Sequence, residues 1–277
     1  MVRAKSVSFS RVVLVIGLLF LYLPMFVLVV YSFNASRLVS VWAGFSTEWY
    51  GALLQDQQLL SAVWMSLRIA FYSASMAVCI GTLASFVMTR FQHFRGRTML
   101  SSMITAPLVM PEVITGLSLL LLFVQMAQLI GWPQDRGMAT IWIAHTTFCS
   151  AYVAVVVSAR LREVDRSIEE AAMDLGATPL KTFFIITIPM IAPALVSGWL
   201  LAFTLSLDDL VIASFVSGPG ATTLPMVVFS SVRLGVSPKI NALATIIIVT
   251  VSIVAFIAWY LVQRSEEKRR QPLPESS

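Results

Sequence analysis

The sequence predicts an all-α integral membrane protein with six transmembrane helices and both termini in the cytoplasm. Two observations predict the fold class and a third predicts the orientation. Only 12% of the 277 residues are charged and 58% are hydrophobic, whereas a soluble domain carries about 25% charged residues. Six apolar runs are each long enough to cross a hydrocarbon core that is roughly 30 Å thick. Basic residues gather beside alternate ends of these runs.

The six runs differ in the features that justify each of them. The first follows Arg3, Lys5 and Arg11 and has no small-x-small cleavage site, so it is expected to be a retained signal-anchor helix. Arg68 opens the second and can extend its charge to the interface. Pro107 kinks the third, together with Pro111. We expect the runs at Val12–Phe33, Ser66–Thr89, Ser101–Leu129, Met138–Ser158, Met190–Val216 and Ala242–Val262.

The distribution of the 19 Lys and Arg residues predicts the orientation. Cytoplasmic loops hold the positive excess in membrane proteins. Fourteen of these residues fall in the amino tail and in the segments after the second, fourth and sixth runs. Both termini are therefore expected in the cytoplasm, and the net charge of +5 is a topology signal rather than a sign of nucleic-acid binding.

These runs divide the chain into five parts. Residues 1–11 form a cytoplasmic tail, 12–33 the first transmembrane helix and 34–65 a periplasmic loop. Residues 66–262 form a core of five helices, with a cytoplasmic loop at 159–189, and residues 263–277 form a second cytoplasmic tail.

The loop between the fourth and fifth runs is patterned as two short helices. Ser167 and Glu170 have the spacing of a capping box. Gly176 is expected to end the first helix in the left-handed conformation. Thr178 and Pro179 then begin a second helix, which runs from Leu180 to Ile188. An apolar stripe follows one face of the first helix at Ile168, Ala171, Ala172 and Leu175. It either packs under the protein's own bundle or docks a partner, and periodicity alone favours neither.

Three carboxylates lie inside the apolar runs, at Glu112, Asp208 and Asp209. Burying a charge in a membrane is costly, so these residues either line a water-filled path or pair locally, with free backbone amides, Arg136 or Arg233. Adjacent helical residues point about 100° apart, so one of the two aspartates is expected to cap or pair nearby. His145, in the fourth run, is expected to hydrogen-bond across helices.

The sequence predicts neither a catalytic nor a metal site. Cys79 and Cys149 lie within apolar runs, so no disulfide framework or thiolate metal site is indicated. The glycines of Gly218-Pro219-Gly220 lack the lysine of a phosphate loop. We therefore expect no nucleotide site and no bound cofactor in this chain.

One long motif resembles a known family. Glu170-Ala171-Ala172, Gly176 and Ile186-Thr187-Ile188-Pro189 are similar to the EAA motif of bacterial binding-protein-dependent ABC importer permeases, with Ile188 in place of the usual Leu. Met110–Gly116, Asp165–Glu170 and Leu205–Leu210 resemble the polyamine branch, and most closely the putrescine importers. The resemblance implies a type I (MetI-like) permease bundle in which Glu170, Ala171, Ala172 and Gly176 couple to a cytoplasmic ATPase.

The same resemblance implies the setting of the chain. It implies a bacterial inner-membrane subunit that forms half of a polyamine path with a second permease subunit. Two copies of an ATPase, which use ATP and Mg²⁺, and a periplasmic polyamine-binding protein complete the assembly. Two alternatives remain open from the residues: an ion-coupled secondary transporter that works alone, and an intramembrane serine protease that uses Ser118 and His145.

Overall fold

The computed structural model describes residues 2–38, 41–91, 93–234 and 237–270. These residues are helical with short connections, apart from an isolated bridge between Asn34 and Phe45. Six of the described helical stretches are long and apolar enough to cross a membrane, as predicted. They are Phe9–Tyr31, Gln57–Arg90, Glu112–Ile130, Met138–Glu163, Pro179–Asp208 and Pro238–Ile257.

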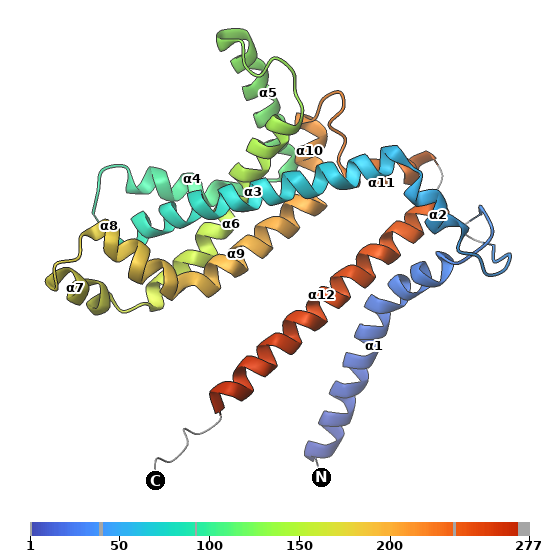
Figure 1. Ribbon diagram of the computed structural model, residues 1–277, viewed down its shortest axis with the longest axis horizontal. Helices are drawn as coiled ribbons and strands as arrows, with labels where there is room; N and C mark the ends of the chain where they lie inside the picture. The colour runs from blue at the N-terminus through green and yellow to red at the C-terminus, as the bar shows by residue number, and fades with distance from the viewer. Residues whose placement is uncertain (1, 39–40, 92, 235–236, 271–277) are drawn as a thin grey trace. The chain divides into compact units, whose positions relative to one another are not determined.

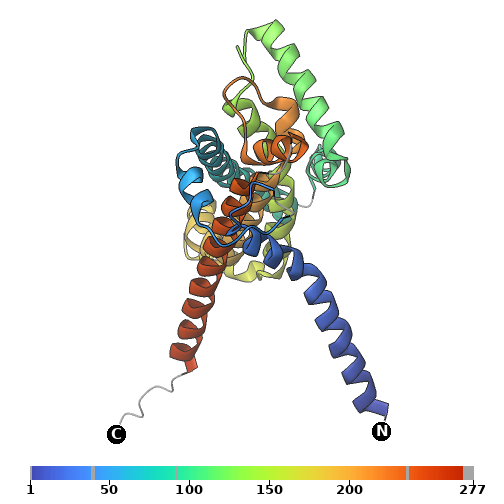
Figure 2. The ribbon, with the colours of Figure 1, turned by 90° about the vertical axis from the view of Figure 1, so that its right-hand side faces the viewer.

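The chain divides into two compact units, Met1–Gln57 with Ser230–Ser277, and Gln58–Phe229. The first unit holds α1 (Val2–Tyr31), α2 (Glu48–Leu54) and α12 (Pro238–Arg270), with α12 in contact with the other two. The amino end of α1 and the carboxyl end of α12 lie at the same end of this unit (Figures 1 and 2). Both expected cytoplasmic tails are helical where the structure describes them, over residues 2–11 in α1 and 263–270 in α12. Met1 and 271–277 lie outside the described residues.

Two polar contacts organise the connection between α1 and α3 in the first unit. The indole N–H of Trp49 donates to the carbonyl of Asn34 at 2.6 Å. The ammonium of Lys239, in the first turn of α12, lies 3.0 Å from the carboxylate of Asp56. These contacts order much of the segment that was expected to be a simple periplasmic loop, 34–65.

The second unit contains the remaining helices. α3, α6 and α9 lie alongside one another, and α7 and α8 lie at one end of them (Figure 1). The bounds are α3 (Gln57–Arg90), α4 (Arg97–Val109), α5 (Glu112–Ile130), α6 (Met138–Glu163), α7 (Arg166–Asp174), α8 (Pro179–Thr182), a π-helical segment η1 (Phe183–Thr187), α9 (Ile188–Asp208), α10 (Val211–Val216) and α11 (Leu224–Leu234). α3 begins and α11 ends just outside this unit.

Small residues let α3 pack closely on α6. A Cβ placed on Gly81 would lie 2.8 Å from the Val153 side chain and 2.9 Å from the Ser150 carbonyl, so a larger residue would push the helices apart. One turn later, the hydroxyl of Ser85 donates to the Ala154 carbonyl at 2.8 Å. The core therefore centres on α6, where Ile141, Val153, Val157 and Leu161 are fully buried.

Two expected runs are each broken into two helices. The run expected at Ser101–Leu129 ends as α4 at Val109 and resumes as α5 at Glu112. The cause is Pro111, because a residue before proline avoids the helical region, and Met110 is extended with ψ at 137°. The run expected at Met190–Val216 is interrupted after Asp208, where Asp209 is extended. The second run was also set too late, since α3 begins at Gln57 rather than Ser66.

Candidate functional site

The helix–glycine–helix unit between α6 and α9 begins with an aspartate rather than a serine. Asp165 accepts a hydrogen bond from the backbone N–H of Ser167 at 3.0 Å, so the capping box predicted from Ser167 and Glu170 is wrong. The backbone N–H and then the hydroxyl of Ser167 hold the pKa of Asp165 below its usual value, because both stabilise the carboxylate. We call α7, α8 and the turn between them the elbow.

The turn of the elbow follows the prediction. Gly176 has φ of 90°, and its N–H donates to the Met173 carbonyl, while Ala177 donates to Ala172. This pair of bonds is a Schellman motif, which satisfies the last carbonyls of α7. Thr178 then caps α8 through the N–H of Lys181, and Pro179 occupies the first turn.

The second helix of the elbow does not stop where the sequence suggested. It was expected to run from Leu180 to Ile188 and to end at Pro189. Instead α8 passes through η1 directly into α9, and Pro189 lies in the first turn of that helix. The N–H of Ile188 still donates to the Phe183 carbonyl with the wider spacing of η1, and Pro189, which has no N–H, follows directly after it. The elbow is therefore joined to a transmembrane helix by one unbroken helical path.

The apolar stripe of α7 faces away from the rest of the chain. Leu175 is 91% exposed and Ile168 is 43% exposed. Ala171 and Glu170 are also exposed, and Ala172 is half-buried. Of the two readings left open by periodicity, packing under the chain's own bundle is therefore wrong, and the stripe is left available to a partner.

The inner side of α7 carries a contact that the sequence did not predict. Glu169 is buried, and its Oε1 accepts from the guanidinium of Arg90, the last residue of α3, at 2.9 Å. The same oxygen accepts from the hydroxyl of Thr187 in η1, also at 2.9 Å. Arg90 in turn donates to the carbonyl of Leu161 near the end of α6. These four residues, the Glu169 cluster, tie the elbow to three helices.

Glu112 lies at a helix start, not in the middle of a helix. It is exposed in the first turn of α5, directly after the break at Pro111. A carboxylate is favourable at that position because the first N–H groups of a helix carry partial positive charge. The expected cost of burying it mid-span therefore does not arise in this chain.

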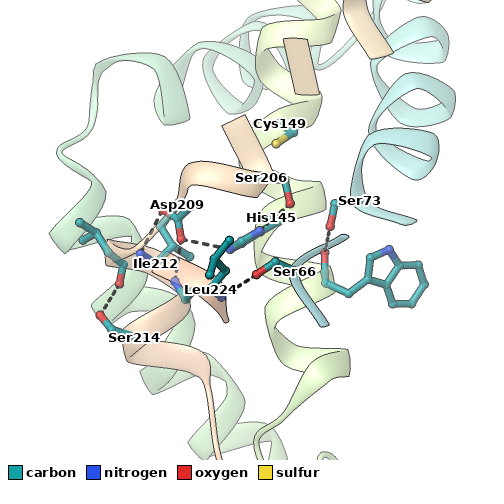
Figure 3. A network of polar contacts seen from close by, with 12 residues as sticks. Ser66, Ser73, His145, Cys149, Ser206, Asp209, Ile212, Ser214 and Leu224 are labelled. Carbon is teal, nitrogen blue, oxygen red and sulfur yellow. Dashed lines mark hydrogen bonds and ion pairs between the residues drawn. The ribbon is translucent and has the colours of Figure 1, made fainter. Parts of the chain in front are cut away.

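The buried carboxylate of Asp209 caps the second helix break, which lies between α9 and α10. Asp209 accepts from the N–H groups of Ile212 at 3.3 Å and Ala213 at 2.8 Å. Its Oδ2 also lies 3.1 Å from Nε2 of His145, whose Nδ1 is 2.7 Å from the hydroxyl of Ser206 (Figure 3). The expectations that one aspartate caps locally and that His145 bonds across helices are confirmed. The proposed partners Arg136 and Arg233 are not the residues that hold Asp209; the guanidinium of Arg136 donates to the Phe215 carbonyl.

The two adjacent aspartates have different surroundings. The Asp209 side chain is 5% exposed, whereas Asp208 is exposed at the last residue of α9. Asp208 forms no ion pair within the described part of the chain. Of the three carboxylates predicted for a substrate path, Glu112 and Asp208 therefore present free surface, and Asp209 is engaged by neighbouring groups.

Sequence comparison assigns the fold and the elbow to a family. The family of binding-protein-dependent transport system inner membrane components matches residues 77–271, well over half of the chain. The chain belongs to this family. The matched range includes the elbow, the Glu169 cluster and the three carboxylates.

Individual relatives of this permease chain cover nearly its whole length. The putrescine transport system permease protein PotI of Escherichia coli (strain K12) is 70% identical over 258 residues, which are 93% of this chain and 92% of that protein. The spermidine/putrescine transport system permease protein PotC of the same strain is 41% identical, over 90% of this chain and 91% of that protein.

A solved structure agrees on the fold. A chain of a bacterial ABC transporter involved in the import of the acidic polysaccharide alginate superposes with a TM-score of 0.72 at 18% identity, over 95% of this permease and 96% of that chain. The likeness at this identity concerns the fold alone.

The pairing of Ser118 with His145 is wrong. Both ring nitrogens of His145 are engaged by Ser206 and Asp209, and Ser118 is exposed on α5. The Ser206, His145 and Asp209 side chains do form a chain of contacts like that of a hydrolase, but all three are buried. A nucleophile must meet its substrate, so the arrangement suits a structural tie between helices.

The described residues offer no group of three or more His, Cys, Asp or Glu side chains that could hold a metal ion. The residues that sequence reasoning missed are Arg90, Glu169 and Thr187. The signal for Glu169 was available, because it is a carboxylate at the edge of the apolar stripe, one residue after Ile168. Nothing local pointed to Arg90, which is 79 residues away.

Proposed function

We propose that this chain is the permease subunit of an ATP-driven polyamine importer, with putrescine as the substrate. The observation that carries the proposal is the 70% identity to a putrescine transport system permease protein over 93% of the chain. The 41% identity to a spermidine/putrescine permease supports the wider polyamine class. In this proposal the chain forms half of the path beside a second permease subunit, in the bacterial inner membrane.

The elbow is the part that couples this permease to a cytoplasmic ATPase. Its stripe supplies an apolar surface, in which Ile168, Ala171 and Leu175 are exposed and Ala172 is half-buried. Glu170, the first residue of the EAA motif, is exposed on the same helix. Gly176 sets the angle between the two helices. The excess of basic residues around the elbow supports its cytoplasmic location, with both termini on that side. This chain has no phosphate loop, so ATP is hydrolysed on a partner subunit. Two copies of that ATPase use ATP and Mg²⁺.

The Glu169 cluster gives this coupling a physical route. When the ATPase moves α7, Glu169 pulls on Arg90 at the end of α3 and on Thr187 in η1. α9 continues from η1 for 21 residues, about 30 Å at 1.5 Å per residue, to the break at Asp209. A displacement of the elbow is thereby passed to the far end of α9, and the bundle alternates between two states that the nucleotide binds differently.

The exposed carboxylates suit a cationic substrate. Glu112 and Asp208 lower the energy of a polyamine in the path without holding it tightly, because a conducting site must also release. Asp209 supports the path by fixing the break rather than by meeting the substrate directly. A periplasmic binding protein delivers the polyamine to the outer side of the path.

The test is uptake of labelled putrescine and spermidine by the reconstituted assembly, with and without ATP and with each companion left out in turn. We expect uptake that requires ATP and the ATPase, and slower uptake for Glu112→Gln and Asp208→Asn. Uptake by this chain alone would indicate a secondary transporter and overturn the proposal. Wild-type rates for Glu112→Gln, Asp208→Asn and Asp209→Asn, each made singly, would overturn the cation path.

Docking of the ATPase has its own matched pair of variants. Burying a leucine contributes about 1.5–3 kcal/mol, so Leu175→Ser should weaken retention of the ATPase on the purified permease roughly tenfold or more. Leu54→Ser is the control, because Leu54 is 68% exposed on α2, outside the elbow and the spans. Equal retention in both variants would show that the stripe does not dock the ATPase.

A further inference from the structure

A cavity of about 660 Å³ at the base of the elbow is lined by an unusual concentration of positive charge. The acidic residue that lines it, Asp165, is engaged in capping α7. Arg90 is also paired with Glu169, which lies outside this lining. The charge of the lining remains positive, so the cavity favours an anion with several hydrogen-bond acceptors. The four arginines of the lining are Arg90, Arg97, Arg162 and Arg166.

Two of these arginines are held in place before any ligand arrives. Arg90 donates through Nη1 to the Leu161 carbonyl, and Arg166 donates through Nη2 to the Thr89 carbonyl. Each guanidinium carries five N–H donors, and the one on Nε of Arg90 is buried without a hydrogen-bond partner. Pinned side chains lose little freedom on binding, so the cavity is a built site rather than a chance gathering of surface charges.

The cavity lies where two membrane spans end. Arg90 is the last residue of the span Gln57–Arg90, and Arg162 is the penultimate residue of the span Met138–Glu163. The ends of spans reach the polar headgroup region of a bilayer. An anion bound among these arginines therefore lies at the level of the lipid phosphates.

A second cavity distinguishes a lipid from a free phosphate. It measures about 250 Å³, lies between α4 and α6, and shares Met88 and Arg162 with the first cavity. Its lining includes Ile104, Ala154 and Val155. A free phosphate ion has no apolar part to place against these side chains, whereas a phospholipid has an acyl chain attached to its phosphate.

The geometry points to a binding site for an anionic phospholipid. Its phosphate lies among the four arginines, and an acyl chain passes Arg162 and follows Val155 between α4 and α6. Such a lipid joins the start of α7, through Arg166, to the ends of α3 and α6, through Arg90 and Arg162. It therefore steadies the base of the elbow. The inference rests on the proposed membrane-embedded permease assembly but not on its substrate.

The experiment measures the lipid that the complete purified assembly retains from micelles containing equal amounts of dioleoylphosphatidylglycerol and dioleoylphosphatidylcholine. Removing one guanidinium near the membrane surface should lower phosphatidylglycerol retention about fivefold in Arg162→Gln. Arg160→Gln is the matched control, since Arg160 is also exposed near the end of α6 but pairs with Glu163 and lines neither cavity. It should retain lipid like the wild type.

A second variant tests the acyl chain. Val155 lines the second cavity and is 51% exposed, so Val155→Trp fills that cavity without disturbing the core. This variant should also reduce phosphatidylglycerol retention. If retention is unchanged in Val155→Trp and an excess of inorganic phosphate displaces the lipid, the occupant is a free phosphate and the inference fails. If Arg162→Gln keeps the lipid but loses the ATPase, an acidic surface of the partner fills the cavity, and the inference also fails.

The lipid result and the transport result are separable. If the wild-type assembly shows no preference for phosphatidylglycerol but still takes up putrescine with ATP, only the lipid site is overturned. Retained selectivity without ATP-driven uptake overturns only the proposed function.

Discussion

Glu169 and Asp209 are both buried carboxylates that hold a helix end, but they lie at opposite ends of the path from α8 to α9 and are held differently. A guanidinium and a hydroxyl from other segments hold Glu169, and the opposite face of its own helix is exposed. An imidazole and two backbone N–H groups hold Asp209. Its neighbours His145, Ile212 and Ala213 are all buried.

This difference separates a movable end from a fixed end. α7 has only nine residues, and its side chains Arg166 and Glu169 hold it to the rest of the unit. A partner protein that binds its exposed stripe can therefore shift it as a unit. The Asp209 end is enclosed by the packed core of α6, α9 and α10. We infer that motion enters at the elbow. α9 and α10 keep their arrangement at the Asp209 break, so they move together as one rigid element.

The largest expected effect breaks the fixed end. Asp209→Ala removes the acceptor of three buried donors, and stranding buried polar groups in this way should cost about 3 kcal/mol. The thermal midpoint of the purified assembly should fall by roughly 10 °C. Asp208→Ala is the control, one residue away and exposed, and should shift the midpoint little. Equal shifts would contradict the division of roles between the two aspartates.

The next effect breaks the movable end. Glu169→Ala leaves Arg90 with a buried positive charge and should cost about 2 kcal/mol, because hydrogen bonds to charged groups are worth about 1.5–3 kcal/mol. The more telling readout is the amount of ATP hydrolysed per putrescine transported, which should rise. Glu170→Ala, the exposed neighbour, should preserve the ATP cost of transport while weakening ATPase attachment.

A double variant sharpens that result. Replacing both partners of a buried ion pair by apolar residues restores stability better than removing one partner. Arg90→Met with Glu169→Met should therefore regain thermal stability but remain uncoupled. Recovery of coupling in the double variant would show that packing, and not the ion pair, carries the motion.

A smaller effect tests the angle of the elbow. Gly176 has φ of 90° and open space where a Cβ would lie, so Gly176→Val adds backbone strain of about 1–2 kcal/mol and no clash. Gly131→Val at the end of α5 has the same features, with φ of 71°. Both variants should lose similar stability, but only Gly176→Val should uncouple ATP hydrolysis from uptake. Normal uptake and ATPase stimulation in Gly176→Val would count against the elbow.

The smallest expected effect concerns pH at the start of α7. The folded pKa of Asp165 is lowered by Ser167, so the cap stabilises α7 at pH values above the unfolded pKa of the carboxyl group and is lost as the pH falls through the folded pKa. Hydrogen exchange of the Ser167 amide, relative to the Ala177 amide at the other end, should quicken on acidification. Asp165→Asn keeps a capping oxygen without titrating, so this ratio should stay flat with pH.

Sequence patterns predicted the features that depend on neighbouring residues. Hydrophobic runs predicted six spans because every span must satisfy its own backbone in a lipid environment. Gly176 and Thr178 were identified correctly since their roles depend on local backbone geometry. The cap at the start of α7 was assigned to Ser167 instead of Asp165, because both residue types cap helices and the two positions lie only two residues apart.

The features that depend on distant residues required the tertiary structure. Pro111 indicated a bend, but only the structure placed Glu112 at a helix start. The Glu169–Arg90 pair joins residues 79 positions apart, and the His145–Asp209 pair joins residues 64 positions apart. Local periodicity carries no information about contacts at such separations.

The sequence alone therefore determined the all-helical membrane fold, the position of the elbow and the residues of its apolar stripe, because each follows from hydrophobicity and turn chemistry within a short segment. Only the tertiary structure decided which side of α7 faces outward and which carboxylate is free. Those outcomes depend on how α3, α6 and α9 pack, and packing brings together donors and acceptors that the order of the chain keeps apart.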